Sequence, residues 1–505
     1  MNTTSLWTRP SAAVALAGLL AGCAAVGPNF QPPAAPKASG YATGGDDANA
    51  GPIQTAVGEK VAAEWWTLFR SPALDHVVRE AIANNKSLAE ARARLAAARE
   101  DVTAQSGLLT IDANAGFQRE RANLNAFSGG AFNLKNAPAG LSFPTNPEFN
   151  LYTLGTTVSY NLDLFGAKRR EVESLRATAE SQARELDAAY LTLTGKVVAQ
   201  ALEIADANVQ IGALGDIADA DQADLDMIRK SQAAGGASAS DVAFAETTLA
   251  QDKALVPVQR QRLAAARHAM AVLVGETPDS FAAPDFDATS GSLPLTLPVS
   301  LPSELVRQRP DILEAEARLH AATAEIGIAT AALYPNITLS ANYALNGLTP
   351  ETLFDRTSVG WAIGPSLTVP IFHSGELKAR RQEARENARA ALLAYEETVL
   401  EAFSQVADAL TAVGHDNTGY AEQTRALGAA TERLAMTRRA FREGGTSAEQ
   451  VVRAERDWRR TRLALSQQGV GRYSDAARLL LATAHAPPGA AEAPVEPATA
   501  QHSGQ

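Results

Sequence analysis

The sequence predicts a mainly α-helical chain with membrane β-strands, four per chain, and three observations support that fold class. Two stretches of about 70 residues contain no proline and place apolar residues at helical spacing. Four short stretches alternate large apolar with small polar residues, as strands do when their two faces meet different surroundings. Finally, the two halves of the chain repeat one plan, which indicates a duplicated architecture.

Composition narrows the class of function. The chain has 505 residues, a formal net charge of −11, 46% hydrophobic residues and 20% charged residues. These fractions are ordinary for a folded protein. An acidic balance without a basic block argues against nucleic acid as a partner. Cys23 is the single cysteine, which excludes a disulfide within the chain and a cysteine-rich metal site.

Residues 1–22 have the pattern of a bacterial lipoprotein signal peptide, with a short apolar stretch that ends at the run Leu20-Ala21-Gly22-Cys23. Small residues before a cysteine resemble a lipobox, where the thiol is acylated and the chain is cut ahead of it. The alternative is an incidental cysteine inside a signal peptide. Ala24 follows, not Asp, so we expect a lipid-anchored protein of the outer membrane that faces the periplasm.

Residues 23–58 are rich in Ala, Pro and Gly, and we expect an extended, acylated tether with no core of its own. The end of the chain, 486–505, has the same composition and is expected to be a disordered tail. Neither segment is expected to add to the folded body.

The repeat is clearest at two glycine pairs. The run Gly235-Gly236-Ala237-Ser238 recurs 209 residues later as Gly444-Gly445-Thr446-Ser447. Each half is therefore predicted to run helix, strand hairpin, long helix, Gly-Gly turn, helix. The predicted organisation is a first repeat 59–274 with hairpin 111–163 and tip 235–238, a Pro-rich linker 275–302, and a second repeat 303–485 with hairpin 336–371 and tip 444–447.

The strands show period-2 alternation. In 151–163 large apolar residues occupy the even positions and small or polar residues the odd ones. The same alternation is found in 336–346 and 358–371, and more weakly in 111–118. Strands of this length fit a transmembrane barrel wall. The alternative, a soluble sheet packed on helices by one face, is also compatible with the pattern.

Four strands are too few to close a barrel around a channel. An open sheet in lipid would leave its edge N–H and C=O groups unpaired. If the strands span the membrane, several subunits must share one barrel, and three copies would contribute twelve strands. The Asn-, Gly- and Pro-rich connection 121–150 would then be an external loop.

The helices predicted between 166–234 and 376–443 could each reach roughly 100 Å. Their apolar residues form heptad-like seams, which predicts coiled-coil packing. The Gly-Gly turns fold each long helix back on a second one, at 240–273 and 447–481, so each chain should contain two antiparallel coiled-coil hairpins.

Together with these features, several local motifs resemble the TolC-like outer-membrane factors, in particular the lipoprotein branch that serves resistance-nodulation-division tripartite efflux systems. The motifs are Val26-Gly27-Pro28-Asn29-Phe30 after Cys23, Trp65-Trp66-Thr67-Leu68-Phe69, Tyr160-Asn161-Leu162-Asp163-Leu164-Phe165-Gly166, and Arg309-Pro310-Asp311-Ile312. Trp65-Trp66 is interpreted as packing rather than a ligand platform, and Pro310 with Asp311 as a helix start.

The resemblance implies a trimeric channel-tunnel, with a twelve-stranded β-barrel and a periplasmic α-barrel made of the coiled-coil helices. It implies a homotrimer in outer membrane lipid whose helix tips meet a periplasmic adaptor (membrane fusion) protein, which an inner-membrane pump feeds. The adaptor-contact candidates at the tips are Gly235, Gly236, Ser238, Gly444, Gly445 and Ser447.

The resemblance also implies a gate of acidic residues at the tip end. Asp241 matches such a position, whereas Gln450 and Arg453 stand where the family often has aspartates. An Asp241–Arg453 pair and a more weakly acidic ring are both compatible with this departure. Asp241 also has a purely structural explanation, as a residue that stabilises the positive end of a helix.

The sequence contains no catalytic constellation, and no cofactor or metal is expected. The seven histidines are scattered, and there is no Walker loop, dinucleotide fingerprint or nucleophile elbow. We therefore expect a passive exit duct for small toxic compounds or drugs, and not an enzyme. Two rivals stay open: a TolC-like channel for type I protein secretion, and a structural coiled-coil lipoprotein without a pore.

Overall fold

The computed structural model describes residues 25–34, 41, 53–121, 148–286 and 296–487. They form two compact units, each described by itself below. The first contains the described residues up to Gln31, with Arg99–Ala177 and His320–Ala390, and the second contains the remainder. Each unit therefore draws on both sequence repeats. The predicted signal peptide 1–22, the acylation site Cys23, most of the predicted external loop and nearly all of the predicted tail lie outside the described residues.

The elements follow the predicted order in both halves. Those of the first half are β1 Gln54–Val57, η2 Trp65–Phe69, α2 Pro72–Asn84, α3 Lys86–Gln105, β2 Leu109–Arg121, β3 Glu148–Asn161, α5 Ala167–Ala233 and α6 Ala239–Val274. Those of the second half are β4 Thr296–Val299, α7 Pro302–Gln308, α8 Pro310–Ala331, β5 Asn336–Gly347, η4 Thr352–Phe354, η5 Arg356–Ser358, β6 Val359–Thr368, α9 Glu376–Arg442 and α10 Ala448–Thr483.

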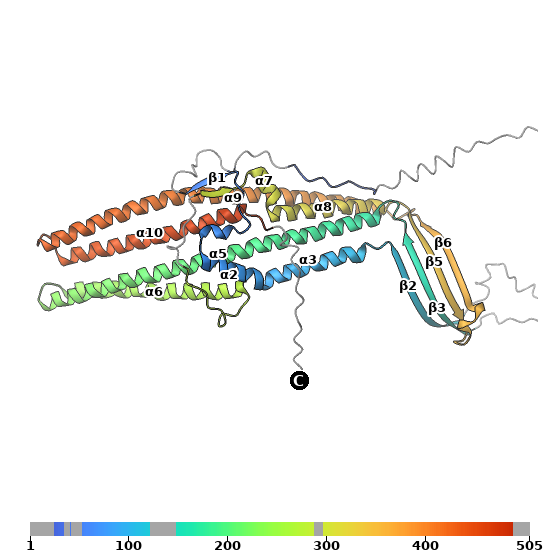
Figure 1. The fold of residues 1–505 in the computed structure, drawn as a ribbon, viewed down its shortest axis with the longest axis horizontal. Coiled ribbons are helices and arrows are strands. Elements are labelled where there is room, and N and C mark those ends of the chain that lie inside the picture. The colour runs from blue at the N-terminus through green and yellow to red at the C-terminus, as the bar shows by residue number, and fades with distance from the viewer. Residues whose placement is uncertain (1–24, 35–40, 42–52, 122–147, 287–295, 488–505) are drawn as a thin grey trace, which may run out of the picture. The chain divides into compact units, whose positions relative to one another are not determined.

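The first unit is built on an antiparallel sheet with strand order β2-β3-β5-β6, whose strands lie side by side in Figure 1. The four predicted strands are confirmed, but the boundaries of β2, β3 and β6 were wrong: β3, for instance, spans Glu148–Asn161 rather than 151–163. β2 extends beyond the predicted 111–118 at both ends, because it pairs with β3 along its whole length. β6 ends at Thr368 rather than at residue 371, since Pro370 has no N–H to continue a ladder.

The corner from β3 to α5 is closed by one carboxylate. Asp163 accepts hydrogen bonds from the backbone N–H groups of Lys168 at 2.9 Å and Arg169 at 3.0 Å. These are N–H groups of the first helical turn, which have no partner inside the helix. The sequence motif around Asp163 therefore acts as a helix cap that turns the chain from strand to helix.

The segment after Cys23 packs against the first unit, so the expectation of a tether without a core was wrong there. The N–H of Val26 donates to the carbonyl of Phe165 at 3.0 Å. Buried Arg170 donates to the carbonyl of Val26 at 3.2 Å and to Oδ1 of Asn29 at 2.7 Å. The two bonds at Val26 satisfy backbone groups that the extended chain would otherwise leave unpaired.

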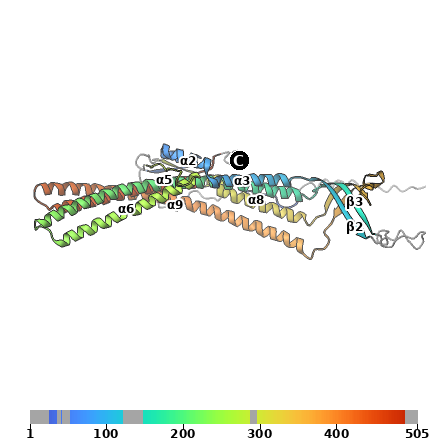
Figure 2. The same ribbon diagram turned by 90° about the horizontal axis from the view of Figure 1, so that it is seen from below.

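The helical hairpins match the prediction closely. α5 and α9 each have 67 residues, and α6 and α10 each have 36. Figures 1 and 2 both show α6 lying along α5, and Arg262 of α6 donates to Glu203 of α5 at 3.0 Å. The predicted heptad seams are mostly buried, at Leu186, Tyr190, Leu193, Val197 and Ile204 in α5 and at Tyr395, Val399, Val406, Leu410 and Val413 in α9.

The core of the second unit contains the tryptophan pair. Trp65 and Trp66 are fully buried with ring centroids 6.4 Å apart, and Nε1 of Trp66 donates to Asp75 at 3.0 Å. Their interpretation as packing residues is confirmed. Nearby, β1 pairs in parallel with β4. The sequence prediction missed this two-stranded sheet, because it assigned β1 to the tether and β4 to the linker.

The approach of the N-terminal segment to α8 gives the first prediction. Gly27 has φ +97°, and a Cβ there would lie 2.5 Å from Cα of Gly327. We expect Gly27→Ala to displace the segment and to destabilise the fold by about 2 kcal/mol more than its backbone strain alone. The readouts are the thermal unfolding midpoint and the protease cleavage rate within residues 25–34.

Gly58→Ala is the matched control, since Gly58 has φ +99° and nothing within 4 Å of the added Cβ. Equal effects of the two substitutions would show that the segment does not approach α8 as described.

Candidate functional site

The register of the sheet gathers its apolar residues on one face. Val158 pairs with Ile111 and Ala341, and Tyr343 pairs with Trp361. The opposite face carries small and polar residues, among them the paired Ser159 and Ser340. Because the side chains of paired residues lie on the same face, the alternation predicted strand by strand becomes one continuous apolar surface.

This apolar surface has little cover within the chain. Trp361 is 74% exposed and Ile363 is 66% exposed. An exposed apolar face of this extent, opposite a polar one, suits contact with hydrocarbon on one side and water on the other. Among the helices of the described residues, none is both long and apolar enough to cross a membrane.

The two hairpin tips are built alike. Gly235 and Gly444 take φ values of +80° and +76°, which only glycine adopts without strain. Ser238 and Ser447 then cap the returning helices: their hydroxyls accept from the N–H groups of Asp241 and Gln450 at 3.2 and 3.4 Å. The predicted tip residues thus occupy the two reversals, as expected from the repeat.

Asp241 is part of a capping box. Its carboxylate accepts from the backbone N–H and the hydroxyl of Ser238, each at 2.8 Å. These hydrogen bonds hold the pKa of Asp241 below its ordinary range. Arg453 forms its ion pair with Glu449, one turn away on its own helix. Within one chain, therefore, Asp241 and Arg453 do not form the pair that the sequence left open.

A charged group that sequence reasoning missed links the two hairpins farther along their helices. Arg456 of α10 donates to buried Asp221 of α5 and to buried Asp252 of α6, each at 3.3 Å. Arg460 reaches Asp252 at the same distance. We call Asp221, Asp252, Arg456 and Arg460 the hairpin cluster.

In the hairpin cluster the two buried aspartates share the guanidinium of Arg456. Burial raises the pKa of Asp221 to about 6, and the hydrogen bond and charge of Asp252 act in the same direction, while Arg456 lowers it. The arginine spacing on α10 could have indicated a charged contact face. Nothing in the sequence identified the two aspartates, more than 200 residues away, as its partners.

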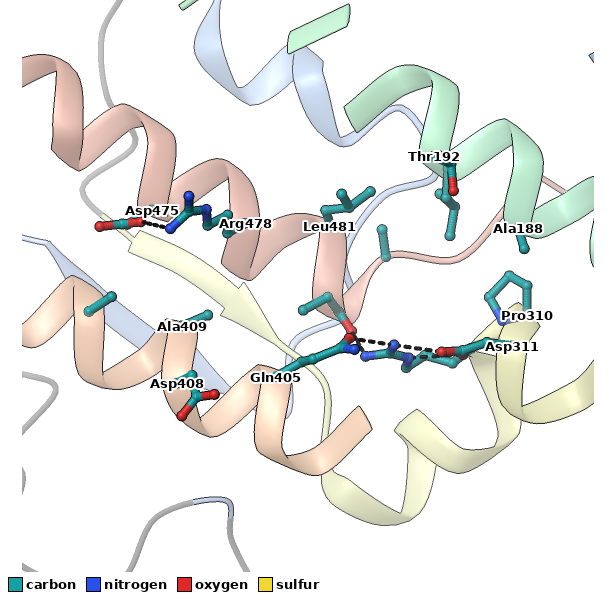
Figure 3. Close-up of a pocket in the computed structure, with 15 residues that line it drawn as sticks. Ala188, Thr192, Pro310, Asp311, Gln405, Asp408, Ala409, Asp475, Arg478 and Leu481 are labelled. Carbon is teal, nitrogen blue, oxygen red and sulfur yellow. Dashed lines mark hydrogen bonds and ion pairs between the residues drawn. The ribbon is translucent and has the colours of Figure 1, made fainter. Parts of the chain in front are cut away.

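A pocket of about 520 Å³ lies in the second unit, and the two arginines in its lining, Arg309 and Arg478, each pair with an aspartate (Figure 3). Arg309 donates to Asp311 at 2.6 Å, to Gln405 at 2.8 Å and to the carbonyl of Ala482 at 3.1 Å. Arg309 thereby joins the start of α8 to α9 and to the end of α10, a structural task. Among the described residues, no group of His, Cys, Asp and Glu has the arrangement of a metal site.

Comparisons with known proteins agree with this architecture. A family model described as outer membrane efflux protein matches residues 77–276 and 301–485. The toluene efflux pump outer membrane protein TtgI of Pseudomonas putida is 30% identical over 465 residues, 87% of this chain and 90% of that protein. The probable outer membrane lipoprotein SilC of Salmonella typhimurium is 26% identical over 442 residues, 87% of this chain and 90% of that protein.

Solved structures give the same result. The outer-membrane channel OprN has a TM-score of 0.77 at 26% identity and covers 91% of this chain and 99% of its own. The Neisseria gonorrhoeae MtrE outer membrane channel, solved in an open state, has a TM-score of 0.71 at 26% identity. It covers 91% of this chain and 98% of its own.

The two segments that the family model matches correspond to the two repeats read from the sequence. The sheet supplies an apolar face whose edge strands have no second partner among the described residues, and the paired hairpins supply a long helical wall. The predicted TolC-like channel-tunnel fold is confirmed, and the chain belongs to the outer membrane efflux protein family as an efflux channel component of the outer membrane.

Proposed function

We propose that the chain is the passive exit duct of a tripartite pump for small toxic compounds, acting as a homotrimer anchored by acylated Cys23. The observation that carries the proposal is the sheet: its apolar face is exposed, and among the described residues its edge strands β2 and β6 each pair with only one strand. Three copies would pair these edges and close twelve strands around a water-filled bore.

The relatives support the cargo class. TtgI is named as part of a toluene efflux pump, and SrpC of Pseudomonas putida as part of a solvent efflux pump. We propose that this chain likewise passes small molecules, which reach it from an inner-membrane resistance-nodulation-division pump through a periplasmic adaptor protein. The proposed adaptor contacts are the two tips, Gly235, Gly236 and Ser238 with Gly444, Gly445 and Ser447.

Two alternatives differ in what they predict. A type I secretion channel would conduct ions but would restore export of a protein rather than drug resistance in a deletion strain. A structural lipoprotein would not conduct at all. Single-channel recording in planar bilayers, followed by drug-susceptibility measurements on the deletion strain, separates the three. A purified protein that remains monomeric and never conducts would overturn the proposal.

We further propose that the hairpin cluster holds the tips together in the closed duct and that Asp241, Gln450 and Arg453 line the gate. Arg456→Gln should raise the resting conductance several-fold, because two buried carboxylates then lose their shared cation.

Asp241→Ala should also raise the resting conductance, which is the leak through the closed duct. Ser447→Ala serves as the control for loss of capping, since the Ser447 hydroxyl caps the matching helix of the other repeat. An unchanged leak in Asp241→Ala would remove that residue from the gate.

The raised pKa of Asp221 predicts a pH dependence with a definite sign. Because the folded pKa of about 6 exceeds the ordinary 3.8, the folded chain binds this proton more tightly than the unfolded chain. Its contribution to stability is therefore present at low pH and is lost as pH rises through about 6. When the pH is lowered from about 7.5 to about 5.5, the thermal unfolding midpoint of the wild type should gain a stabilising increment from Asp221. The Asp221→Asn variant should lack that increment.

Asp241→Asn is the control for this experiment, because the pKa of Asp241 is lowered rather than raised and its titration lies below that range. An equal acid increment in the wild type and in Asp221→Asn would assign the effect to other groups.

The lipid anchor is tested by metabolic labelling with palmitate. Cys23→Ser should abolish incorporation, because the chain has no second thiol. Label that persists in the variant would refute acylation at Cys23, whereas conductance of the purified variant would show that the duct itself does not require the anchor.

A further inference from the structure

The start of α9 carries a line of basic residues for which no partner is found among the described residues. Counting along the helix, Lys378, Arg381, Arg385 and Arg389 are spaced three, four and four residues apart. At 3.6 residues per turn, this spacing places them on one side of α9 over about 16 Å. We call these four residues the basic stripe.

The basic stripe gathers four like charges on one side of a helix. Several other arginines pair with a carboxylate one turn away, as Arg380 does with Glu376 and Arg94 with Glu90. Within the described part of the chain the basic stripe has no such pair: Glu383 lies on another side of the helix, and Glu386 accepts from Gln382 at 2.6 Å. Three of its four members are exposed and Arg381 is half-buried. Four like charges along one side are mutually repulsive unless an anion lies against them.

The chain just before the basic stripe is apolar and uncovered. Ile371 is 92% exposed and Phe372 is 83% exposed, and both follow directly on β6 with its exposed Trp361. Strand β6, these two residues and the start of α9 as far as Ala390 belong to the same compact unit. Along the chain, an apolar strand face is thus followed by an exposed aromatic residue and then by cations. This is the order in which a protein crosses from hydrocarbon through the membrane interface to lipid phosphates.

We infer that the basic stripe is a docking surface for anionic phospholipid headgroups of the periplasmic leaflet, with Ile371 and Phe372 inserted at the acyl boundary. The inference rests on the proposed membrane position of the sheet. Arginine suits this task because its planar guanidinium donates two hydrogen bonds to one phosphate and stays charged. Such contacts would fix the depth at which the helical wall leaves the membrane.

The test uses the purified full-length protein in a non-ionic detergent. Phosphatidylglycerol and phosphatidylcholine are titrated separately, and bound lipid is counted by native mass spectrometry. A basic residue close to an anionic surface strengthens binding by roughly fivefold. The wild type should therefore prefer phosphatidylglycerol by at least about tenfold, and Arg385→Gln/Arg389→Gln should remove most of that preference. High salt should weaken it in the wild type.

Two variants control for charge and for folding. Arg439→Gln/Arg442→Gln removes the same charge from exposed positions on the last turn of the same helix and should leave the preference unchanged. Arg385→Lys/Arg389→Lys retains the charge and should restore most of the preference. Failure of the lysine variant to do so while its oligomer remains intact would contradict an electrostatic headgroup surface.

Other occupants give distinct results. Full competition by inorganic phosphate would show a phosphate pocket rather than a lipid surface. Dissociation of the oligomer in the Gln variant, with lipid preference unchanged, would show that the basic stripe pairs with carboxylates of a second copy of the chain. Either result overturns the inference. Conductance of the same variants in planar bilayers reports separately on the proposed duct. The lipid surface and the duct can therefore fail independently.

Discussion

The two free edges of the sheet are the constraint on which the rest of the molecule depends. In the part of the chain that the structure describes, β2 and β6 each hydrogen-bond to a single strand, so along one side of each strand the backbone N–H and C=O groups need another partner. In water, solvent supplies it. In hydrocarbon each unsatisfied group costs several kcal/mol, and only pairing with another strand removes that cost. One copy in a membrane is thus an incomplete fold, and assembly is part of folding.

Most of this architecture could be predicted because it rests on local periodicity. Alternation of apolar and polar residues predicts which face of a strand is apolar. A long stretch without proline that carries a heptad seam predicts a long helix. Both patterns are local and do not depend on the rest of the chain. The seam residues Tyr190 and Val399 are buried as their spacing required. The capped turns at Ser238 and Ser447 were likewise predictable, because a glycine pair followed by serine stops one helix and starts the next.

The features that sequence reasoning missed all join segments far apart in the chain. Asn29 lies 141 residues from Arg170, which holds it, and Asp221 lies 235 residues from Arg456. Periodicity carries no information about such partners. β1 was missed for a related reason: four residues paired with four others at Thr296–Val299 are too short a run to show alternation, and the surrounding Ala, Pro and Gly composition predicts an extended tether.

The repeats have kept their dimensions while their contact faces differ. The paired helices have equal lengths in both halves, so both hairpins extend equally far from their first residues. Their charges are complementary instead of equal: α10 presents Arg456 and Arg460, while α5 and α6 present Asp221 and Asp252. The second repeat has Ala430 and Thr461 where the first repeat has Asp221 and Asp252, so two second-repeat hairpins would leave these arginines without carboxylates. A first-repeat hairpin therefore fits a second-repeat hairpin better than it fits its own kind, which favours strict alternation of the two kinds in any ring that copies of this chain form.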